Sequence, residues 1–332
     1  MTLPAVALAV LGGTITMTAP GHGQAVQPSL DAARLLQAVP GLDKIAHLSL
    51  ETLFIKPGAS LSLPDMLLVH GWARGAVEQG AAGVVVVQGT DTLEESAYLL
   101  DLLWDREEPV VFTGAMRSPE QRAPDGPANI YAAIQAAGSP AMRGLGVTVV
   151  MDEHVHAARR VRKTDSMSLG AFSSGTFGSL GRFHEGALTL GNRLSRCRPL
   201  PPPGAARIVV PLLTAALGDE GEVIRLLADA ESIGGLVIAG FGVGHVSAGA
   251  ADAIAAAAML MPVVLCTRTG AGPVLHATYG FRGSEQDLIG RGAIPGGWLD
   301  ARKARVLLLL LLAAGAEDGD IRTAFAEHAA CP

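Results

Sequence analysis

Two threonines in this chain stand just after apolar runs that could form strands of a sheet. Thr14 follows one run and a pair of glycines, and Thr90 follows another run, with Asp91 beside it. A threonine hydroxyl is a weak nucleophile at neutral pH and needs a base close by. Lys163, in a basic run, would complete a Thr-Asp-Lys set that can take up and pass on the hydroxyl proton. These residue types together suggest acyl transfer.

Each of these residues also has a simpler interpretation. Glycines before Thr14 are common in turns, Thr90 and Asp91 could begin a helix, and Lys163 could lie on a solvated basic face. Only the combination of all four favours catalysis over a structural role.

The elements that would position these residues alternate between short apolar runs and helix-period segments. The apolar runs are continuous, as in strands covered on both faces, which predicts a doubly wound parallel sheet with ligands beyond the carboxyl ends of its strands. Thr92 and Glu95 have the spacing of a helix capping box. The predicted strands are Ala5–Val10, Val84–Gln88, Val110–Thr113, Leu145–Val150, Ile208–Leu212, Leu236–Ala239 and Val263–Cys266. The predicted helices are Leu30–Ala38, Pro64–Gln79, Thr92–Asp105, Ala128–Ala137, Glu220–Ala230, Ala248–Ala258 and Ala301–Ala314.

Length and one composition break predict two α/β lobes. A chain of 332 residues exceeds what one core usually fills, and the proline-rich segment Cys197–Gly204 cannot continue a helix or a central strand. We therefore expect an N-terminal catalytic domain at residues 1–195, a linker at 196–207 and a smaller C-terminal α/β domain at 208–332. The larger, N-terminal domain should hold the doubly wound, flavodoxin-like sheet.

The composition excludes several other classes of function. A net charge of −6 and 4% aromatic residues give no general attraction to nucleic acid or lipid and no base-stacking surface. Three cysteines without a C-x-x-C pair suggest neither disulfides nor zinc, and His154 and His156, in a predicted loop, lack a third ligand. The N-terminus lacks the basic region of a signal peptide, and Val306–Ala314 is too short to span a bilayer and is predicted to be a buried helix. We expect a cytoplasmic protein without membrane or nucleic-acid partners.

Several motifs give the chain a family resemblance. Leu11-Gly12-Gly13-Thr14-Ile15 resembles T-G-G-T-I, and the segment 88–95, QGTDTLEE, resembles H-G-T-D-T-M-E-E. The segments 113–117 and 125–131 resemble G-A-M-R followed by D-G-P-x-N-x-Y, and 299–305 resembles L-x-P-x-K-A-R. In this order the motifs are similar to those of the bacterial-type L-asparaginase/glutaminase family of threonine amidohydrolases, over essentially the whole chain.

The resemblance implies hydrolysis of L-asparagine to L-aspartate and ammonia through an acyl-threonine intermediate, with glutamine as a potential second substrate and no cofactor. It implies Thr14 as the nucleophile, although which threonine attacks first stays open. Thr90, Asp91 and Lys163 match the family's second cluster, which transfers protons and activates water.

The resemblance also implies substrate contacts. The backbone groups of Thr90 and Ala115 would contact the oxyanion and the leaving amide, and Gly89 would also bind the substrate. Asp91 could pair with the α-ammonium group of the substrate. Glu285 would reach the same cation in a neighbouring subunit, so a homo-oligomer, a dimer or a tetramer, is expected. The serine that holds the substrate carboxylate in the family is replaced by Gly58, which leaves Ser60 as a neighbouring substitute.

Two further departures concern the segment after the first motif and the C-terminal lobe. Met17–Val26 contains no tyrosine, although the family often has one there, and His245 replaces an asparagine of some members. Thr16, Thr18 or His22 could take over the task of the tyrosine.

Two other functions fit the motifs less well. The amidase subunit of a tRNA-dependent amidotransferase resembles this family but carries an additional N-terminal domain, for which the early first motif is expected to leave no room. A non-catalytic amino-acid-binding module would keep the cleft without turnover. The missing tyrosine and serine favour that module, and the complete set of four catalytic candidates opposes it.

Overall fold

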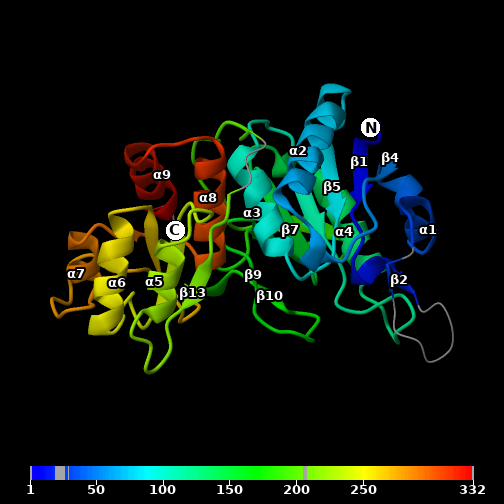
Figure 1. The fold of residues 1–332 in the computed structure, drawn as a ribbon. Coiled ribbons are helices and arrows are strands. Elements are labelled where there is room, and N and C mark those ends of the chain that lie inside the picture. Colours follow the sequence, from blue (N-terminus) through cyan, green and yellow to red (C-terminus); the bar gives the residue numbers. More distant parts are fainter. Residues whose placement is uncertain (1, 19–26, 29, 205–207, 331–332) are drawn as a thin grey trace. The chain divides into compact units, whose positions relative to one another are not determined.

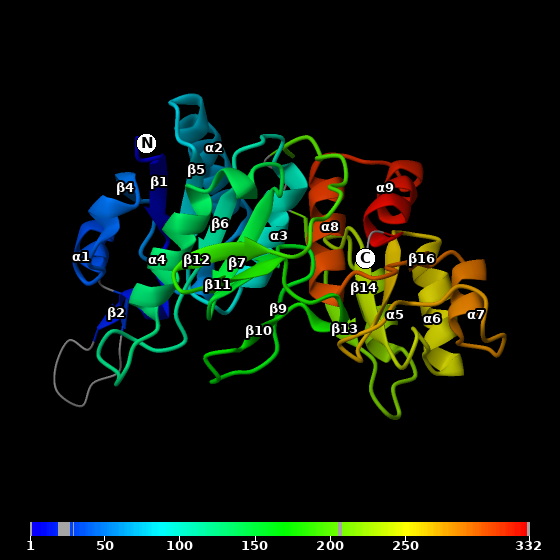
Figure 2. The same ribbon diagram turned by 180° about the vertical axis from the view of Figure 1, so that it is seen from behind.

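The computed structural model describes residues 2–18, 27–28, 30–204 and 208–330. Its internal contacts divide the chain into two compact units, Met1–Pro199 and Leu200–Pro332. Each unit combines helices with a sheet, as Figure 1 and the reverse view in Figure 2 show. The proline-rich segment is irregular as far as Gly204, and the end of the predicted linker, 205–207, lies outside the described residues.

The N-terminal unit is built on an eight-stranded sheet. Its strands, in spatial order, are β12 (Ala187–Leu190), β11 (Gly181–His184), β8 (His154–Ala157), β7 (Val147–Met151), β6 (Val110–Thr113), β5 (Gly83–Val87), β1 (Ala5–Val10) and β4 (His47–Thr52). The five strands from β7 to β4 are parallel, and β8, β11 and β12 extend them in antiparallel fashion. The order β4-β1-β5-β6-β7 is the flavodoxin-like one, so the predicted doubly wound sheet is confirmed.

Neighbouring parallel strands end at the same level of this sheet. Val10, the last residue of β1, lies beside Val87 of β5, and Val87 lies beside Thr113 of β6. The loops after these strands therefore leave from one edge. Because β4 lies on one side of β1 and the later strands lie on the other, this edge has its topological switch point between β1 and β5, where ligands bind in such sheets.

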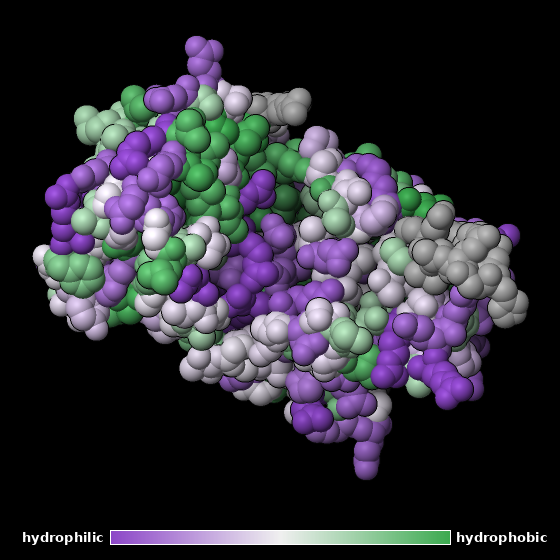
Figure 3. Space-filling view, turned by 60° about the horizontal axis from the view of Figure 1, so that its bottom comes forward, coloured by the Kyte–Doolittle hydropathy of each residue, from purple (hydrophilic) through white to green (hydrophobic). Residues whose placement is uncertain are grey.

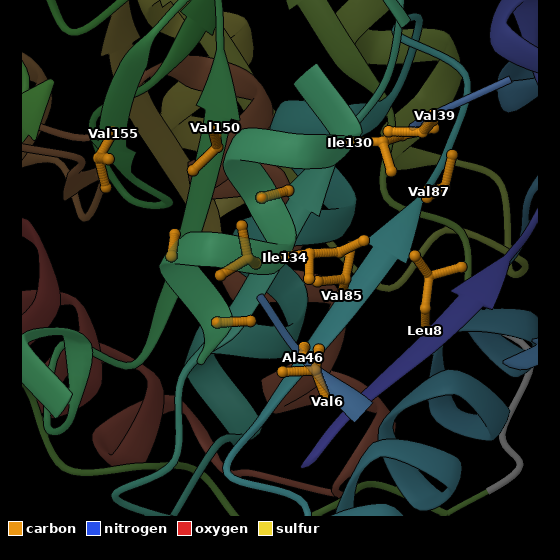
Figure 4. Packing of buried hydrophobic residues seen from close by; sticks show 14 of the residues in the cluster. Val6, Leu8, Val39, Ala46, Val85, Val87, Ile130, Ile134, Val150 and Val155 are labelled. Carbon is orange, nitrogen blue, oxygen red and sulfur yellow. The ribbon is translucent and has the colours of Figure 1, made fainter. Parts of the chain in front are cut away.

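Helices cover both faces of the sheet. The views in Figures 1 and 2 agree that α2 and α3 pack on one face and that α1 and α4 pack on the other. Figure 4 shows the core under α4, in which Val85, Ile130 and Ile134 interdigitate. Burial of each such side chain contributes about 1.5–3 kcal/mol, so this core fixes the sheet that carries the loops. The helices are α1 (Ala32–Gln37), α2 (Leu63–Glu78), α3 (Leu93–Leu103) and α4 (Gly126–Ala137).

Shorter elements of this unit shape the loops. The two-stranded ladders are β2 (Met17–Thr18) with β3 (Gln27–Pro28), and β9 (Arg162–Lys163) with β10 (Phe172–Ser173). The 3-10 turns are η1 (Thr14–Thr16), η2 (Leu42–Lys44), η3 (Gly58–Ser60), η4 (Pro140–Met142) and η5 (Gly175–Phe177).

The C-terminal unit has a four-stranded parallel sheet of its own. Its strands, in spatial order, are β13 (Leu212–Thr214), β14 (Leu236–Gly240), β15 (Val263–Thr267) and β16 (Ile294–Pro295). Its helices are α5 (Glu222–Ala228), α6 (Ala248–Ala258), α7 (Glu285–Gly290), α8 (Ala301–Ala313) and α9 (Asp318–Ala330). The small side chains of α6 pack closely over Leu236 and Ile238, while α8 packs against β13, β14 and β15.

The apolar run of α8 belongs to a helix of 13 residues that is mostly buried, as predicted. Within the described part of the chain, no helix has both the length and the apolar character needed to cross a membrane. The face drawn in Figure 3 mixes hydrophilic and hydrophobic residues without one continuous hydrophobic surface across it.

Three local predictions were wrong. The capping box at Thr92 is not formed, because no side chain caps α3. The predicted strand Ile208–Leu212 begins only at Leu212, apart from a single bridge between Val209 and Ile233. His154 and His156 lie on β8, paired with β7, and not in a loop.

Candidate active site

The loops after β1 and β5 meet through their backbones. Gly13, just before Thr14, lies so close to Gly89, just before Thr90, that a Cβ atom on Gly13 would come 2.1 Å from Gly89 Cα. Gly13 has φ 93° and ψ −175°, a conformation almost confined to glycine. Because no side chain fits at Gly13, glycine there permits the contact. The contact brings the segments that carry Thr14 and Thr90 together at the switch point.

Thr14 begins η1 and is half-buried. The turn behind it is closed by Thr16, whose hydroxyl donates to the Gly13 carbonyl oxygen at 2.8 Å and whose N–H donates to the same atom at 2.9 Å. Thr16 was one of three candidates to take over the task of the tyrosine that the family often has after the first motif, and this hydrogen bond holds its hydroxyl in the turn. His22, another candidate, lies with the rest of 19–26 outside the described residues.

Thr90, Lys163 and Asp91 form a contiguous polar cluster. Lys163 Nζ donates to Thr90 Oγ1 at 2.9 Å and lies 3.7 Å from Asp91 Oδ1. Thr90 is only 4% exposed, whereas the Asp91 side chain is 62% exposed. An ammonium group held on a buried hydroxyl can stabilise negative charge on that oxygen and exchange protons with it. Side-chain contacts thus join three of the predicted residues, Thr90, Lys163 and Asp91. The backbone contact between Gly13 and Gly89 places the loop that carries Thr14 next to the loop that carries Thr90.

The backbone of Lys163 is held by Glu94, a residue to which the sequence reasoning gave no role. Glu94 is buried in the first turn of α3 and accepts a hydrogen bond from the Lys163 N–H. A buried carboxylate is unfavourable unless it is hydrogen-bonded, so this bond is part of what keeps Glu94 inside. The signal was available, because Glu94 belongs to the QGTDTLEE motif, four residues after Thr90.

Gly58 is packed against the same backbone. A Cβ atom on Gly58 would lie 2.9 Å from the Gly89 carbonyl oxygen, so a serine here would require the loop to shift. The Gly58 carbonyl accepts from Thr92 Oγ1 at 2.8 Å, and that hydroxyl accepts from the Gln88 amide at 3.1 Å. Ser60, the expected substitute for the family serine, is exposed at the end of η3.

Ala115 is buried in the loop that follows β6. Asp125 accepts hydrogen bonds from the two backbone N–H groups that follow Ala115, each at 2.9 Å. Asn129 donates to the Gly114 carbonyl at 3.0 Å. Asp125 and Asn129 both belong to the D-G-P-x-N motif, so this motif fixes the backbone around Ala115.

Glu285 lies on α7 in the C-terminal unit, with no exposed side-chain surface. Its Oε1 accepts from the backbone N–H groups of Thr278 at 2.9 Å and Tyr279 at 2.8 Å, and its Oε2 lies 3.1 Å from His245 Nε2. Burial by itself raises the pKa of Glu285, but the surrounding N–H donors and His245 outweigh it and hold the pKa below its usual value. Glu285 is therefore a charged carboxylate engaged within its own unit.

Within the described ranges, no group of three or more His, Cys, Asp or Glu residues could hold a metal ion. His156 Nδ1 lies 2.8 Å from Ser174 Oγ, and His154 Nδ1 lies 2.7 Å from the Asp152 carbonyl oxygen. Hydrogen-bonding contacts with Ser174 and with the Asp152 carbonyl oxygen therefore explain the positions of the two imidazole rings.

Comparison with known proteins covers both units. Residues 5–196 match the family model described as "Asparaginase, N-terminal", and residues 209–325 match "Glutaminase/Asparaginase C-terminal domain". The chain is 37% identical over 331 residues to a probable L-asparaginase from Deinococcus radiodurans, with 98% of each chain covered. It is 33% identical to an L-asparaginase from Bacillus licheniformis, over 93% of this chain and 95% of that one.

The same likeness holds in three dimensions. The crystal structure of a probable cytoplasmic L-asparaginase from Campylobacter jejuni matches with a TM-score of 0.88 at 28% identity, over 98% of this chain and 99% of that one. The chain therefore belongs to the bacterial-type L-asparaginase family that its motifs resemble.

Proposed function

We propose that the protein hydrolyses the side-chain amide of L-asparagine to L-aspartate and ammonia. The observation that carries this proposal is the hydrogen bond of 2.9 Å between the Lys163 ammonium group and the Thr90 hydroxyl. This pair lies at the edge of the sheet where the contact between Gly13 and Gly89 brings the Thr14 loop close to the Thr90 loop. Relatives named L-asparaginases over nearly the full chain support asparagine as the substrate. Glutamine, one methylene longer, is proposed as a side substrate.

In the proposed mechanism the Thr14 hydroxyl attacks the amide carbon, the C–N bond breaks, and the hydroxyl proton leaves with ammonia. Water then cleaves the acyl-threonine ester and releases the carboxylate. We prefer Thr14 over Thr90 as the attacking group because Thr14 stands in the first motif, at the position for which the family resemblance implies the nucleophile, and Thr90 is already hydrogen-bonded to Lys163. Thr90, Lys163 and Asp91 would relay the proton and activate the water.

The backbone N–H groups of Thr90 and Ala115 are the proposed donors to the developing oxyanion and the leaving amide. Both belong to loops held by close packing or by hydrogen bonds with Asp125 and Asn129, and such preorganised donors stabilise charge that develops in the transition state. Gly89 is proposed to contact the substrate between the backbone donors of Thr90 and Ala115. Ser60, exposed on η3, is proposed to contact the substrate carboxylate.

Asp91, with its exposed side chain, is the proposed partner of the substrate ammonium group. We further propose a cytoplasmic homo-oligomer in which the C-terminal unit completes a neighbour's site. The burial of Glu285 and its three partners support an indirect role for it, in which the carboxylate orients the His245 ring. His245 keeps 21% of its side chain exposed between the rings of Tyr279 and Phe281, each 4.9 Å away, and would face the neighbouring subunit.

Ammonia release from L-asparagine under steady-state conditions tests the proposal. Thr14→Ala and Thr90→Ala are each expected to lower kcat by at least about 10²-fold while the urea unfolding midpoint stays close to that of the parent. Thr189→Ala makes the same change at an exposed position of β12 and is expected to leave kcat unchanged. Parent-like activity in both site variants would refute the proposal.

Two other results would indicate the alternative functions. Saturable binding of aspartate in a calorimeter, without asparagine turnover, would indicate a non-catalytic amino-acid-binding module. Specific binding of tRNA would indicate an amidotransferase subunit.

A further inference from the structure

Thr92 lies between two of the loops at the carboxyl edge of the N-terminal sheet. Its hydroxyl donates to the Gly58 carbonyl oxygen at 2.8 Å, and its oxygen accepts a hydrogen bond from Gln88 Nε2 at 3.1 Å. A hydroxyl group has a single hydrogen, so the donation to Gly58 leaves its oxygen to accept, and the Gln88 amide supplies the donor. The two bonds therefore link the turn η3 (Gly58–Ser60) to Gln88, the residue that follows β5.

Gln88 is a rigid support for the Thr92 hydroxyl. Its side chain is fully buried, and its backbone N–H donates to the Thr113 carbonyl oxygen of β6 at 2.9 Å. Its amide nitrogen also donates to Ser96 Oγ on α3, at 3.0 Å. A buried side chain that is held by its backbone and by two hydrogen bonds has little freedom to move, so Gln88 fixes the place of the Thr92 oxygen.

The turn η3 has other contacts, which determine what the Thr92 bond adds. The Leu61 N–H also donates to the Gly58 carbonyl oxygen, at 3.2 Å, and closes the turn itself. A Cβ atom on Gly58 would lie 2.9 Å from the Gly89 carbonyl oxygen, so the turn is in contact with the backbone before Thr90. Packing limits how close the two backbones come, whereas a hydrogen bond also has a preferred direction. Loss of the Thr92 bond should therefore displace the turn without unfolding it.

We propose that Thr92 is a positioning residue for substrate binding, which holds η3, and with it Ser60, in place beside the segment of Thr90. The inference rests on the proposed function, in which Ser60 contacts the substrate carboxylate. The Thr92 hydroxyl acts through Gly58 and not on the reacting amide. Because the substrate carboxylate takes no part in the bond changes, a displaced η3 weakens the binding of substrate and transition state alike, which raises KM and leaves kcat unchanged.

Variants of the full-length protein at Thr92 test this role. Thr92→Val keeps the branched shape of the side chain but removes the hydroxyl, so KM for L-asparagine and the Kd of L-aspartate should each rise roughly tenfold for one lost hydrogen bond. Thr92→Ser restores the hydroxyl and should bring both values back to within a few-fold of the parent. Thr323→Val is the matched control, because Thr323 Oγ1 donates to the Gly319 carbonyl oxygen at 2.9 Å at an exposed position of α9, and both values should stay unchanged.

Gln88→Met tests the support behind Thr92. Methionine has a similar length but no donor, so the Thr92 hydroxyl can still reach Gly58, and KM should rise less than in Thr92→Val. In Thr92→Val the Gln88 amide keeps a buried hydrogen without its partner, and the double variant removes that group. The loss in the urea unfolding midpoint of the double variant should therefore be smaller than the sum of the two single losses.

The activity of the parent protein separates this role from the proposed function. A parent that neither releases ammonia from L-asparagine nor binds L-aspartate in a calorimeter would refute the proposed function and, with it, the role of Thr92. Beside an active parent, a Thr92→Val variant with the parent KM and Kd would overturn the positioning role alone. So would a loss that falls on kcat at unchanged KM, or a Thr92→Ser variant that does not recover. Additive losses in the urea midpoint would overturn the support of Thr92 by Gln88.

Discussion

Replacing Gly13 by alanine tests whether the contact between the two motif loops builds the site. The added Cβ atom would lie 2.1 Å from Gly89 Cα and 2.3 Å from Gly89 N, and no rotamer change moves these backbone atoms aside. Gly178 offers a matched control. Its φ of 69° and ψ of 177° lie in the same region as the 93° and −175° of Gly13, but a Cβ atom there meets nothing within 4 Å.

The two substitutions share one cost and differ in another. Alanine in this backbone region costs about 1–3 kcal/mol at either position. Only Gly13→Ala also forces the loops apart, because non-bonded carbons lie about 3.5–4 Å apart and the 2.1 Å contact must open by roughly 1.4 Å. A misplacement of about 1 Å in a catalytic group lowers the rate about 10²-fold, which corresponds to about 2.7 kcal/mol of transition-state stabilisation.

Measurement of kcat/KM for ammonia release, beside urea unfolding, separates the two costs. Both variants are expected to be less stable than the parent, with an additional loss of about 1–3 kcal/mol in Gly13→Ala from overpacking. Only Gly13→Ala should lose about 10²-fold in kcat/KM, while Gly178→Ala stays within a few-fold of the parent. Parent-like activity in Gly13→Ala, or an equal loss in both variants, would show that this contact does not set the geometry of the site.

Three further predictions concern charged and titratable groups. Lys163→Met removes the ammonium group 2.9 Å from the Thr90 hydroxyl, so kcat for ammonia release should fall about 10²–10⁴-fold with little change in the urea midpoint. Burial lowers the pKa of His70 in the folded protein. The stability that the neutral His70 ring contributes is therefore present above about pH 6.5, the pKa in the unfolded chain, and is lost as the pH falls below that value. His70→Leu should flatten the plot of unfolding free energy against pH in this acidic range. For Glu285, burial raises the pKa but the N–H donors outweigh it, so its stabilisation is present above about pH 4.3 and is lost as the pH falls toward the lowered value. Glu285→Gln should therefore destabilise the protein at pH 7 by about 1.5–3 kcal/mol in urea unfolding and by much less in strong acid.

The buried elements of the fold were predictable from sequence. β1, β6 and α6 have the bounds that their apolar runs and helical period predict. A continuous run of Val and Ile has to be covered on both faces, and alternation with helices then favours a parallel sheet. Since parallel strands share a carboxyl edge, the order of strands and helices along the chain is enough to predict that the Thr14 and Thr90 loops approach each other.

Features that depend on exposed strands or distant partners were not predictable. β4 has a mostly exposed, half-polar sequence without an apolar run, so it carries no strand signal of the kind that identified β5. The capping box at Thr92 failed because its hydroxyl donates to Gly58, which is 34 residues away in sequence, and accepts from Gln88. A local rule cannot anticipate a competing partner that only the tertiary fold supplies.

Lys163 shows how a residue that resembles a solvated surface charge can be fixed in a site. Its ammonium group contacts Thr90 and its backbone N–H contacts Glu94, so one short segment at the start of α3 holds both ends of the lysine. Thr90 and Glu94 are four residues apart on that segment, which is anchored in turn by the buried strand β5 and by the packing of α3. The position of the ammonium group therefore depends on the length of the lysine side chain between two fixed points. An arginine would keep the charge but place a larger, planar group in the same span, so Lys163→Arg is not a conservative change here.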